Sequence, residues 1–192
     1  MPRKNAEIIP EGYHALLSVL KERVRAAQIR AALSVNQELI LLYWHIGHDI
    51  RVQQEALGWG TQIADRFAAD LRHAFPGMKG FSRRNVLYMR AFAEAYPDEH
   101  VVQQVVARIP WGHTVRLLDA VKDADERLWY VHQISAHGWS RATLAHHIDV
   151  DLYHRQGQAP TNFAQTLSAP RSDLAQQILK DPYNFDVRRS TA

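Results

Sequence analysis

An uninterrupted stretch of helix-compatible sequence, from Tyr13 to Ile46, is the strongest constraint on the fold. It contains neither proline nor glycine, so nothing in it breaks a helix. Apolar residues recur through it and beyond at steps of three or four, which places them along one side of an α-helix. This predicted stripe consists of Leu16, Leu20, Val24, Ala27, Ala31, Val35, Leu39, Leu42, Ile46 and Ile50.

Such a helix is too long for a small domain to cover. A straight helix from Tyr13 to about Ala56 would be roughly 60 Å long, at about 1.5 Å per residue. Either the helix bends near Gly47, or part of its stripe is covered by another chain. A core helix folded onto its own domain and a self-associating helix both fit the pattern. In the second case we predict a homo-oligomer, most simply a dimer, held by Leu16, Leu20, Val24, Val35, Leu39 and Leu42.

Composition restricts the compartment and the class of protein. The chain has 192 residues and no cysteine, which excludes disulfides and thiolate metal sites and suits a reducing cytoplasm. The densest apolar run, Leu39 to Trp44, is far shorter than the roughly 20 residues of a membrane span. The amino terminus lacks the pattern of a secretory signal. We therefore expect a cytoplasmic protein without a membrane partner.

Shorter helical patterns fill most of the remaining sequence. One runs from about Thr61 to Phe75 and ends at "PGMKG", and three more follow between residues 98 and 138. The predicted fold class is mainly all-α, with a long amino-terminal helix and a helical bundle that contains a helix-turn-helix-like unit. We expect one domain over residues 12–156. Residues 157–192 are expected to form an extended connection, with one candidate short strand, and a carboxy-terminal helix.

One motif occurs twice: a glycine, a large aromatic residue, Ser-Arg, two further residues and an aliphatic residue. The copies are "GFSRRNVL" at residues 80–87 and "GWSRATL" at residues 138–144. Ser82 and Ser140 suit the N-cap position, and Phe81 and Val86 have the spacing of a hydrophobic staple. A glycine before the aromatic residue can end the preceding helix in a left-handed conformation. Each copy therefore predicts a tight turn followed by a new helix.

The first copy also has the composition of a nucleic-acid-binding helix. No acidic residue lies between Leu71 and Ala93. We expect Val86, Met89, Phe92, Ala93 and Tyr96 to face the core. Arginine and asparagine side chains can bind bases or phosphate, and a short turn before such a helix is typical of helix-turn-helix proteins. The predicted contacts on duplex DNA are Arg72, Lys79, Arg83, Arg84, Asn85, Tyr88 and Arg90, with Arg83, Arg84, Asn85 and Tyr88 pointing outward. A solvated basic face between two core helices is the alternative.

The second copy is a weaker candidate for DNA contact. Asp149 and Asp151 follow Arg141 closely, and carboxylates repel a phosphate backbone. We expect this helix to be mainly architectural, with Arg141 as a supporting contact.

No catalytic or metal-binding pattern is evident. The chain has 11 histidines, but the paired histidines of zinc peptidases, with their intervening glutamate, are absent. The adjacent His146 and His147 would point about 100° apart on a helix. Phosphate-binding glycine loops and a serine nucleophile elbow are also missing. We expect no catalytic residue, no cofactor and no metal.

Several phrases, taken in order, resemble a known family. The chain is similar to the amino-terminal domain of YhcG-type proteins, a bacterial family grouped with the PD-(D/E)XK nucleases, in the phrases "LYWHIGHDI", "GFSRRNVLYMRAFAEAYP", "IPWGHTVRLLDAV", "GWSRATLAHHIDVDLYHRQG" and "TNFAQTLSAPRSDLAQQILKDPYNF". The resemblance extends from about Gly12 to Asp186. It implies a helical domain with helix-turn-helix character, followed by a nuclease-like domain.

That nuclease domain is expected to be missing from this chain. A PD-(D/E)XK site needs an acidic residue two positions before its lysine, because carboxylates hold the metal that activates water. The residues at that offset from the lysines are Pro2, Val19, Gly77, Ala120 and Ile178. The chain is then either a truncated or a naturally short form, and not an enzyme. We expect a DNA-binding and assembly domain that targets a nuclease or another effector. An oligomerisation or protein-partner-binding module without DNA contact is the first alternative. An enzyme survives only as a second alternative, with an unrecognised metal-dependent activity.

Overall fold

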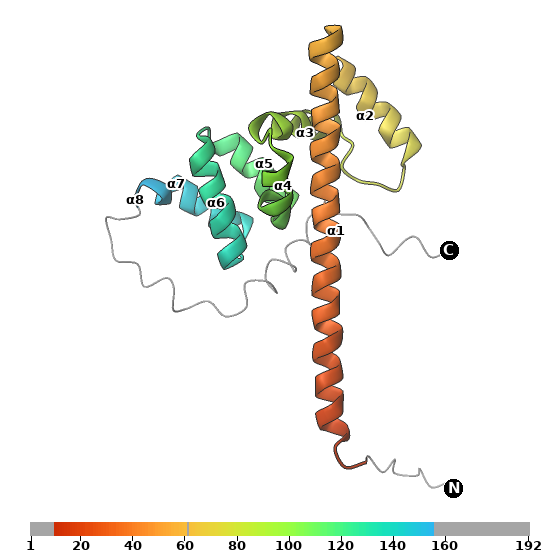
Figure 1. Ribbon diagram of the computed structural model, residues 1–192, viewed down its shortest axis with the longest axis vertical. Coiled ribbons are helices and arrows are strands. Elements are labelled where there is room, and N and C mark those ends of the chain that lie inside the picture. The colour runs from red at the N-terminus through yellow and green to blue at the C-terminus, as the bar shows by residue number, and fades with distance from the viewer. Residues whose placement is uncertain (1–9, 61, 156–192) are drawn as a thin grey trace.

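The computed structural model describes residues 10–60 and 62–155, and every regular element in these ranges is helical (Figure 1). The elements are α1 (Tyr13–Leu57), α2 (Ile63–Ala74), α3 (Arg83–Ala95), α4 (Glu99–Gln104), a 3₁₀ turn (Val106–Arg108), α5 (Trp111–Ala120), α6 (Ala124–His137), α7 (Arg141–Asp149) and α8 (Leu152–Arg155). The predicted fold class, a long amino-terminal helix with a helical bundle, is confirmed. The strand and helix expected within residues 157–192 lie outside the described residues.

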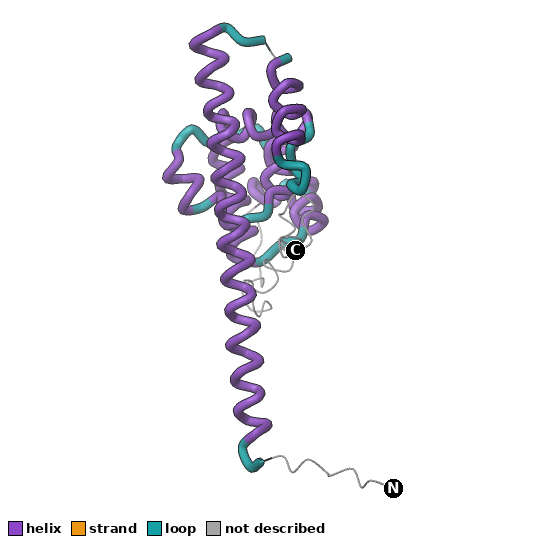
Figure 2. The backbone as a smooth tube through the Cα atoms, turned by 90° about the vertical axis from the view of Figure 1, so that its right-hand side faces the viewer, coloured by secondary structure: helices purple, strands orange, loops and turns teal. Residues whose placement is uncertain are grey.

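Helix α1 is a single rod of 45 residues that runs the length of the molecule (Figures 1 and 2). Of the two alternatives for this helix, the break near Gly47 is wrong, because α1 stays helical through this residue. The glycine has another use there. A β-carbon on Gly47 would lie only 1.9 Å from the carbonyl oxygen of Met89, so the missing side chain lets α3 lie directly against α1.

The core forms around the carboxy-terminal half of α1. Its buried face consists of Ala32, Asn36, Leu39, Ile40, Tyr43, Trp44, Gly47 and Ile50. Helix α3 packs on this face with the five residues predicted to point inward, all of which are buried. The Trp111 ring of α5 contacts the rings of Tyr43 and Phe92, with centroids 4.9 and 5.4 Å apart. Three helices therefore meet at Trp111.

The amino-terminal half of α1 projects away from the body (Figures 1 and 2). No side chain between residues 10 and 31 is buried. The large apolar residues exposed on it are Tyr13 (46%), Leu16 (60%), Val19 (48%), Leu20 (44%) and Val24 (57%). The predicted stripe therefore divides: Leu39 and Ile50 enter the core, whereas its first members face solvent in the isolated chain.

Both copies of the repeated motif begin a helix as predicted. The Ser82 hydroxyl accepts a hydrogen bond from the Asn85 amide at 3.2 Å, and the Ser140 hydroxyl accepts one from the Thr143 amide at 3.1 Å. Gly138 ends α6 in the left-handed region, with φ of 63°. The same prediction is wrong for Gly80, because α2 already ends at Ala74 with Phe75 as its C-cap. The aromatic residue is buried in each copy. The motif is thus confirmed as a helix-starting device.

Candidate nucleic-acid interface

The two helix-turn-helix-like units differ in the length of the turn. Helices α2 and α3 are joined by residues 75–82, and the rings of Phe75 and Phe81 approach to 6.3 Å between centroids. Helices α6 and α7 are joined only by residues 138–140. Because a helix-turn-helix uses a turn of about three or four residues, the first copy departs from that geometry and the second has the usual length.

Arg83 and Arg84 lie exposed on the first turn of α3. The Arg83 Nε is 2.6 Å from Asp65 Oδ1 on α2, with side-chain exposures of 59% and 52%. Arg84 donates to the Tyr88 hydroxyl at 3.1 Å, and its guanidinium carbon lies 5.4 Å from the centre of that ring. The segment from Leu71 to Ala93 has no acidic residue in its sequence, but in the fold Asp65 of α2 lies beside it.

Tyr88 and Arg90 are half-buried and also lie near carboxylates. The Tyr88 hydroxyl lies 2.9 Å from each carboxylate oxygen of Asp119 on α5. Arg90 Nη2 lies 3.7 Å from Glu94 Oε2, one turn further along α3. These contacts leave the start of α3 as the most accessible basic part of the helix.

The prediction that Asn85 points outward is wrong, because this side chain is only 1% exposed. Its Nδ2 donates to the Gly80 carbonyl at 2.6 Å, and its Oδ1 accepts from Trp111 Nε1 at 2.6 Å. Asn85 lies four residues before Met89 and therefore shares the inward face of α3. The amide holds the turn and α5 in place and is not available to a base.

The other predicted contacts are dispersed. Arg72 lies in the last turn of α2, Lys79 in the turn before α3 and Arg141 at the start of α7, and all three are exposed. None of them has an ion-pair partner within residues 10–60 and 62–155. Asp149 lies 3.4 Å from Arg116 of α5, so one of the two carboxylates that follow Arg141 is partly neutralised.

The residues predicted to hold an oligomer have three different environments. Leu16, Leu20 and Val24 are exposed on the projecting part of α1, and Leu42 is exposed beside the body. Val35 is half-buried. Leu39 is 2% exposed and belongs to the core, so its assignment to an intermolecular surface is wrong. Its side chain lies on the face of α1 that α3 and the 3₁₀ turn cover.

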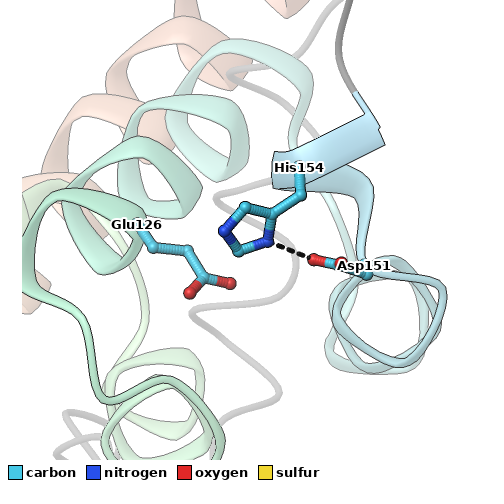
Figure 3. A group of neighbouring side chains, drawn as sticks. All are labelled: Glu126, Asp151 and His154. Carbon is cyan, nitrogen blue, oxygen red and sulfur yellow. Dashed lines mark hydrogen bonds and ion pairs between the residues drawn. The ribbon is translucent and has the colours of Figure 1, made fainter. Parts of the chain in front are cut away.

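One group of side chains has metal-ligand chemistry that sequence reasoning did not find (Figure 3). Glu126 of α6, Asp151 before α8 and His154 of α8 each place one ligand atom within 4.8 Å of the others. His154 Nδ1 lies 2.7 Å from Asp151 Oδ1, and this hydrogen bond raises the pKa of the imidazole. Asp151 and His154 are exposed and pair with each other, so the group is satisfied without an ion. Only their spacing was visible in the sequence, since Glu126 is distant along the chain.

The chain matches the family model of the DUF1016 N-terminal domain over residues 19–155, from the projecting part of α1 to the end of α8. It belongs to the DUF1016 N-terminal domain family. This is the amino-terminal domain of YhcG-type proteins, so the resemblance is confirmed. No curated protein and no solved structure matches the chain. Among the described residues, no helix is long and apolar enough to cross a membrane.

Proposed function

We propose that this DUF1016 N-terminal domain binds duplex DNA through the start of α3, assembles through the projecting part of α1, and so targets a nuclease or another effector to DNA. The observation that carries the DNA contact is the exposure of Arg83 and Arg84 on the first turn of a helix with no acidic residue in that turn. The positive end of the helix dipole and the two guanidinium groups both favour phosphate.

The ion pair between Arg83 and Asp65 is compatible with this role. Both side chains are more than half exposed, and pairs of this kind contribute at most about 1 kcal/mol. DNA presents closely spaced phosphates and gains further from the release of counterions. A phosphate can therefore replace Asp65 as the partner of Arg83.

The test is binding of the double variant Arg83→Glu/Arg84→Glu to duplex DNA across a range of salt concentrations. Loss of two phosphate contacts should flatten the plot of log K against log salt by about 2, at roughly 0.9 per contact. Arg141→Glu makes a single charge reversal at the start of α7 and should weaken binding much less. If the double variant is folded and binds as tightly as the unmodified chain, the DNA contact at α3 is refuted.

The exposed apolar side chains of α1 favour a second candidate function, assembly without DNA contact. Tyr13, Leu16 and Val24 are each about half exposed, and large apolar patches commonly mark interaction sites. Under this alternative the chain self-associates but shows no salt-dependent affinity for DNA. A monomer mass by light scattering at tens of micromolar would contradict assembly in either version.

A further inference from the structure

The projecting part of α1 has the seven-residue pattern of a coiled-coil helix. Its apolar residues alternate steps of four and three, with Leu17, Val24 and Ala31 at one core position and Tyr13, Leu20 and Ala27 at the other. We call these six residues the apolar seam. The pattern continues into Ser34 and Glu38, so it ends where α1 meets the body, whose first buried residue on α1 is Ala32. The seam therefore occupies the part of α1 that the described body, residues 62–155, does not cover.

The apolar seam also points away from the body. Ile40, Tyr43 and Gly47 mark the middle of the face of α1 that the body covers. At 3.6 residues per turn, Leu20 and Val24 lie roughly 150° around the helix from that face. A second helix can therefore lie along the seam without meeting the body of the first chain.

We propose that a second copy of this chain covers the first four residues of the apolar seam in antiparallel orientation, with Tyr13 of one copy opposite Val24 of the other and Leu17 opposite Leu20. This inference rests on the assembly part of the proposed function. The layers in which seam residues meet, Tyr13 with Val24 and Leu17 with Leu20, are apolar on both sides, whereas Ala27 and Ala31 of each copy lie beyond the start of α1 in the other. In an antiparallel pair, a residue at one core position of the heptad faces a residue at the other core position. Tyr13 and Val24 occupy different core positions, and so do Leu17 and Leu20.

The charges beside the seam favour this orientation. Between Gly12 and Gln37 the only acidic residue is Glu22, which pairs with Arg25 in its own helix. A parallel pair would place the two basic segments side by side, and like charges repel. The antiparallel pair places most of each basic segment beside the start of α1 in the other copy, next to the exposed Glu11. The basic segment consists of Lys21, Arg23, Arg25 and Arg30.

The antiparallel arrangement determines where the two α3 helices lie. Each α3 crosses its own α1 at Gly47. With Tyr13 opposite Val24, the two Gly47 residues are roughly 57 residues apart along the pair, which is roughly 85 Å at about 1.5 Å per residue. Dimers that read the two halves of a palindrome need a separation of about 34 Å or a multiple of it, and roughly 85 Å lies midway between two multiples. The pair would therefore bridge two DNA segments rather than read one palindrome.

Disulfide capture tests the orientation directly, because the chain has no cysteine of its own. Tyr13→Cys and Val24→Cys chains are mixed at tens of micromolar and oxidised. The antiparallel pair gives the mixed disulfide and none from Val24→Cys alone, because two such sulfurs would lie about 11 residues apart, roughly 16 Å. Glu22→Cys, on the opposite side of α1, measures random collisions.

Two results would overturn the proposal. A Val24→Cys chain that cross-links to itself above the Glu22→Cys background indicates parallel pairing. A mixed disulfide no more abundant than that background shows that the apolar seam is not paired. Neither result depends on DNA, so failure of the pairing is distinguishable from failure of the DNA contact.

The Val24→Glu variant tests whether pairing of the two α1 helices is needed to bridge two DNA segments. Val24 is 57% exposed, so the substitution should leave the domain folded. We expect loss of the dimer and of the capture of a free duplex by bead-bound DNA, with binding to a single duplex retained. The Arg83→Glu/Arg84→Glu substitutions should leave the pairing intact. When they are added to both the Tyr13→Cys chain and the Val24→Cys chain, the two chains should still form the mixed disulfide. Bridging that survives Val24→Glu would refute the arrangement.

Discussion

Gly47 of α1 lies directly against the peptide group of Met89 in α3. A β-carbon at residue 47 would be 1.9 Å from the Met89 carbonyl oxygen, 2.3 Å from the carbonyl carbon and 2.9 Å from the amide nitrogen of Arg90. These are backbone atoms in the middle of a helix, so they cannot move aside as a side chain can. The contact fixes the distance between the long helix and the helix that carries the proposed DNA contact.

Gly47→Ala should consequently be strongly destabilising. Overpacking a close contact costs about 1 to 3 kcal/mol and occasionally more, and backbone against backbone belongs at the upper end. Urea unfolding followed by circular dichroism measures the change. Gly77→Ala is the matched control, because its added β-carbon meets nothing within 4 Å. If the two variants had equal free energies of unfolding, α1 and α3 could move apart at Gly47 without loss of stability, which would contradict this prediction.

Local patterns predicted the features that depend on neighbouring residues. The N-caps at Ser82 and Ser140 and the inward face of α3 follow from spacing within one helix and its turn. The helix from Tyr13 to Ile46 also follows from the absence of proline and glycine, whereas its continuation through Gly47 does not. These elements would be similar in almost any packing of the chain.

The features that sequence reasoning missed depend on which helices become neighbours. Leu39 and Leu20 share a pattern of three and four, yet one is in the core and the other in solvent, because the body covers only half of α1. The burial of Asn85 depends on Trp111, far along the chain. The pairing of Arg83 with Asp65 depends on how α2 lies beside α3. No local spacing carries that information.

The buried Asn85 gives a prediction about stability rather than DNA affinity. Asn85→Ala leaves the buried Trp111 indole N–H and the half-buried Gly80 carbonyl without their partner, and a buried unpaired group costs about 1 to 3 kcal/mol. We expect a loss of about 2 kcal/mol or more by urea unfolding. Trp111→Phe removes the other end of one bond, so a double-mutant cycle should show non-additive costs. Additive costs, or a DNA-binding defect in fully folded Asn85→Ala, would contradict the structural role.

We expect His147 to make the fold less stable in acid. The side chain is buried against the Trp139 ring, with centroids 4.2 Å apart, and its pKa is lowered by burial and then by the neighbouring His146 and His137. The folded state therefore binds this proton less tightly than the unfolded state. Its contribution to stability is present above about pH 6.5, the ordinary histidine value, and is lost as the pH falls below it.

Replacement of His147 by Gln should flatten the fall in the urea midpoint between pH 7.5 and 5.5. His154→Gln is an informative comparison, because the hydrogen bond to Asp151 raises the pKa of His154. That contribution is present below about pH 6.5 and is lost as the pH rises through the folded-state value, which is the opposite sign. An unchanged pH dependence in the His147→Gln chain would show that this imidazole does not couple to folding.

Asp65→Asn tests whether the partner of Arg83 competes with phosphate. The substitution frees the Arg83 guanidinium and removes a negative charge beside the start of α3, so DNA affinity should rise several-fold, with a salt slope steeper by up to about 0.9. Asp70→Asn is the matched control: it lies on the same helix, is similarly exposed, pairs with Arg66 and changes the net charge equally. Because Asp65 lies in the first turn of α2, its loss should lower stability by only about 0.3 to 1 kcal/mol.

Titration of labelled duplex DNA with each variant at several salt concentrations separates the outcomes. An equal gain in both variants would reflect net charge alone and would remove Arg83 from the proposed contact, whereas a gain confined to Asp65→Asn identifies Asp65 as the group that phosphate displaces.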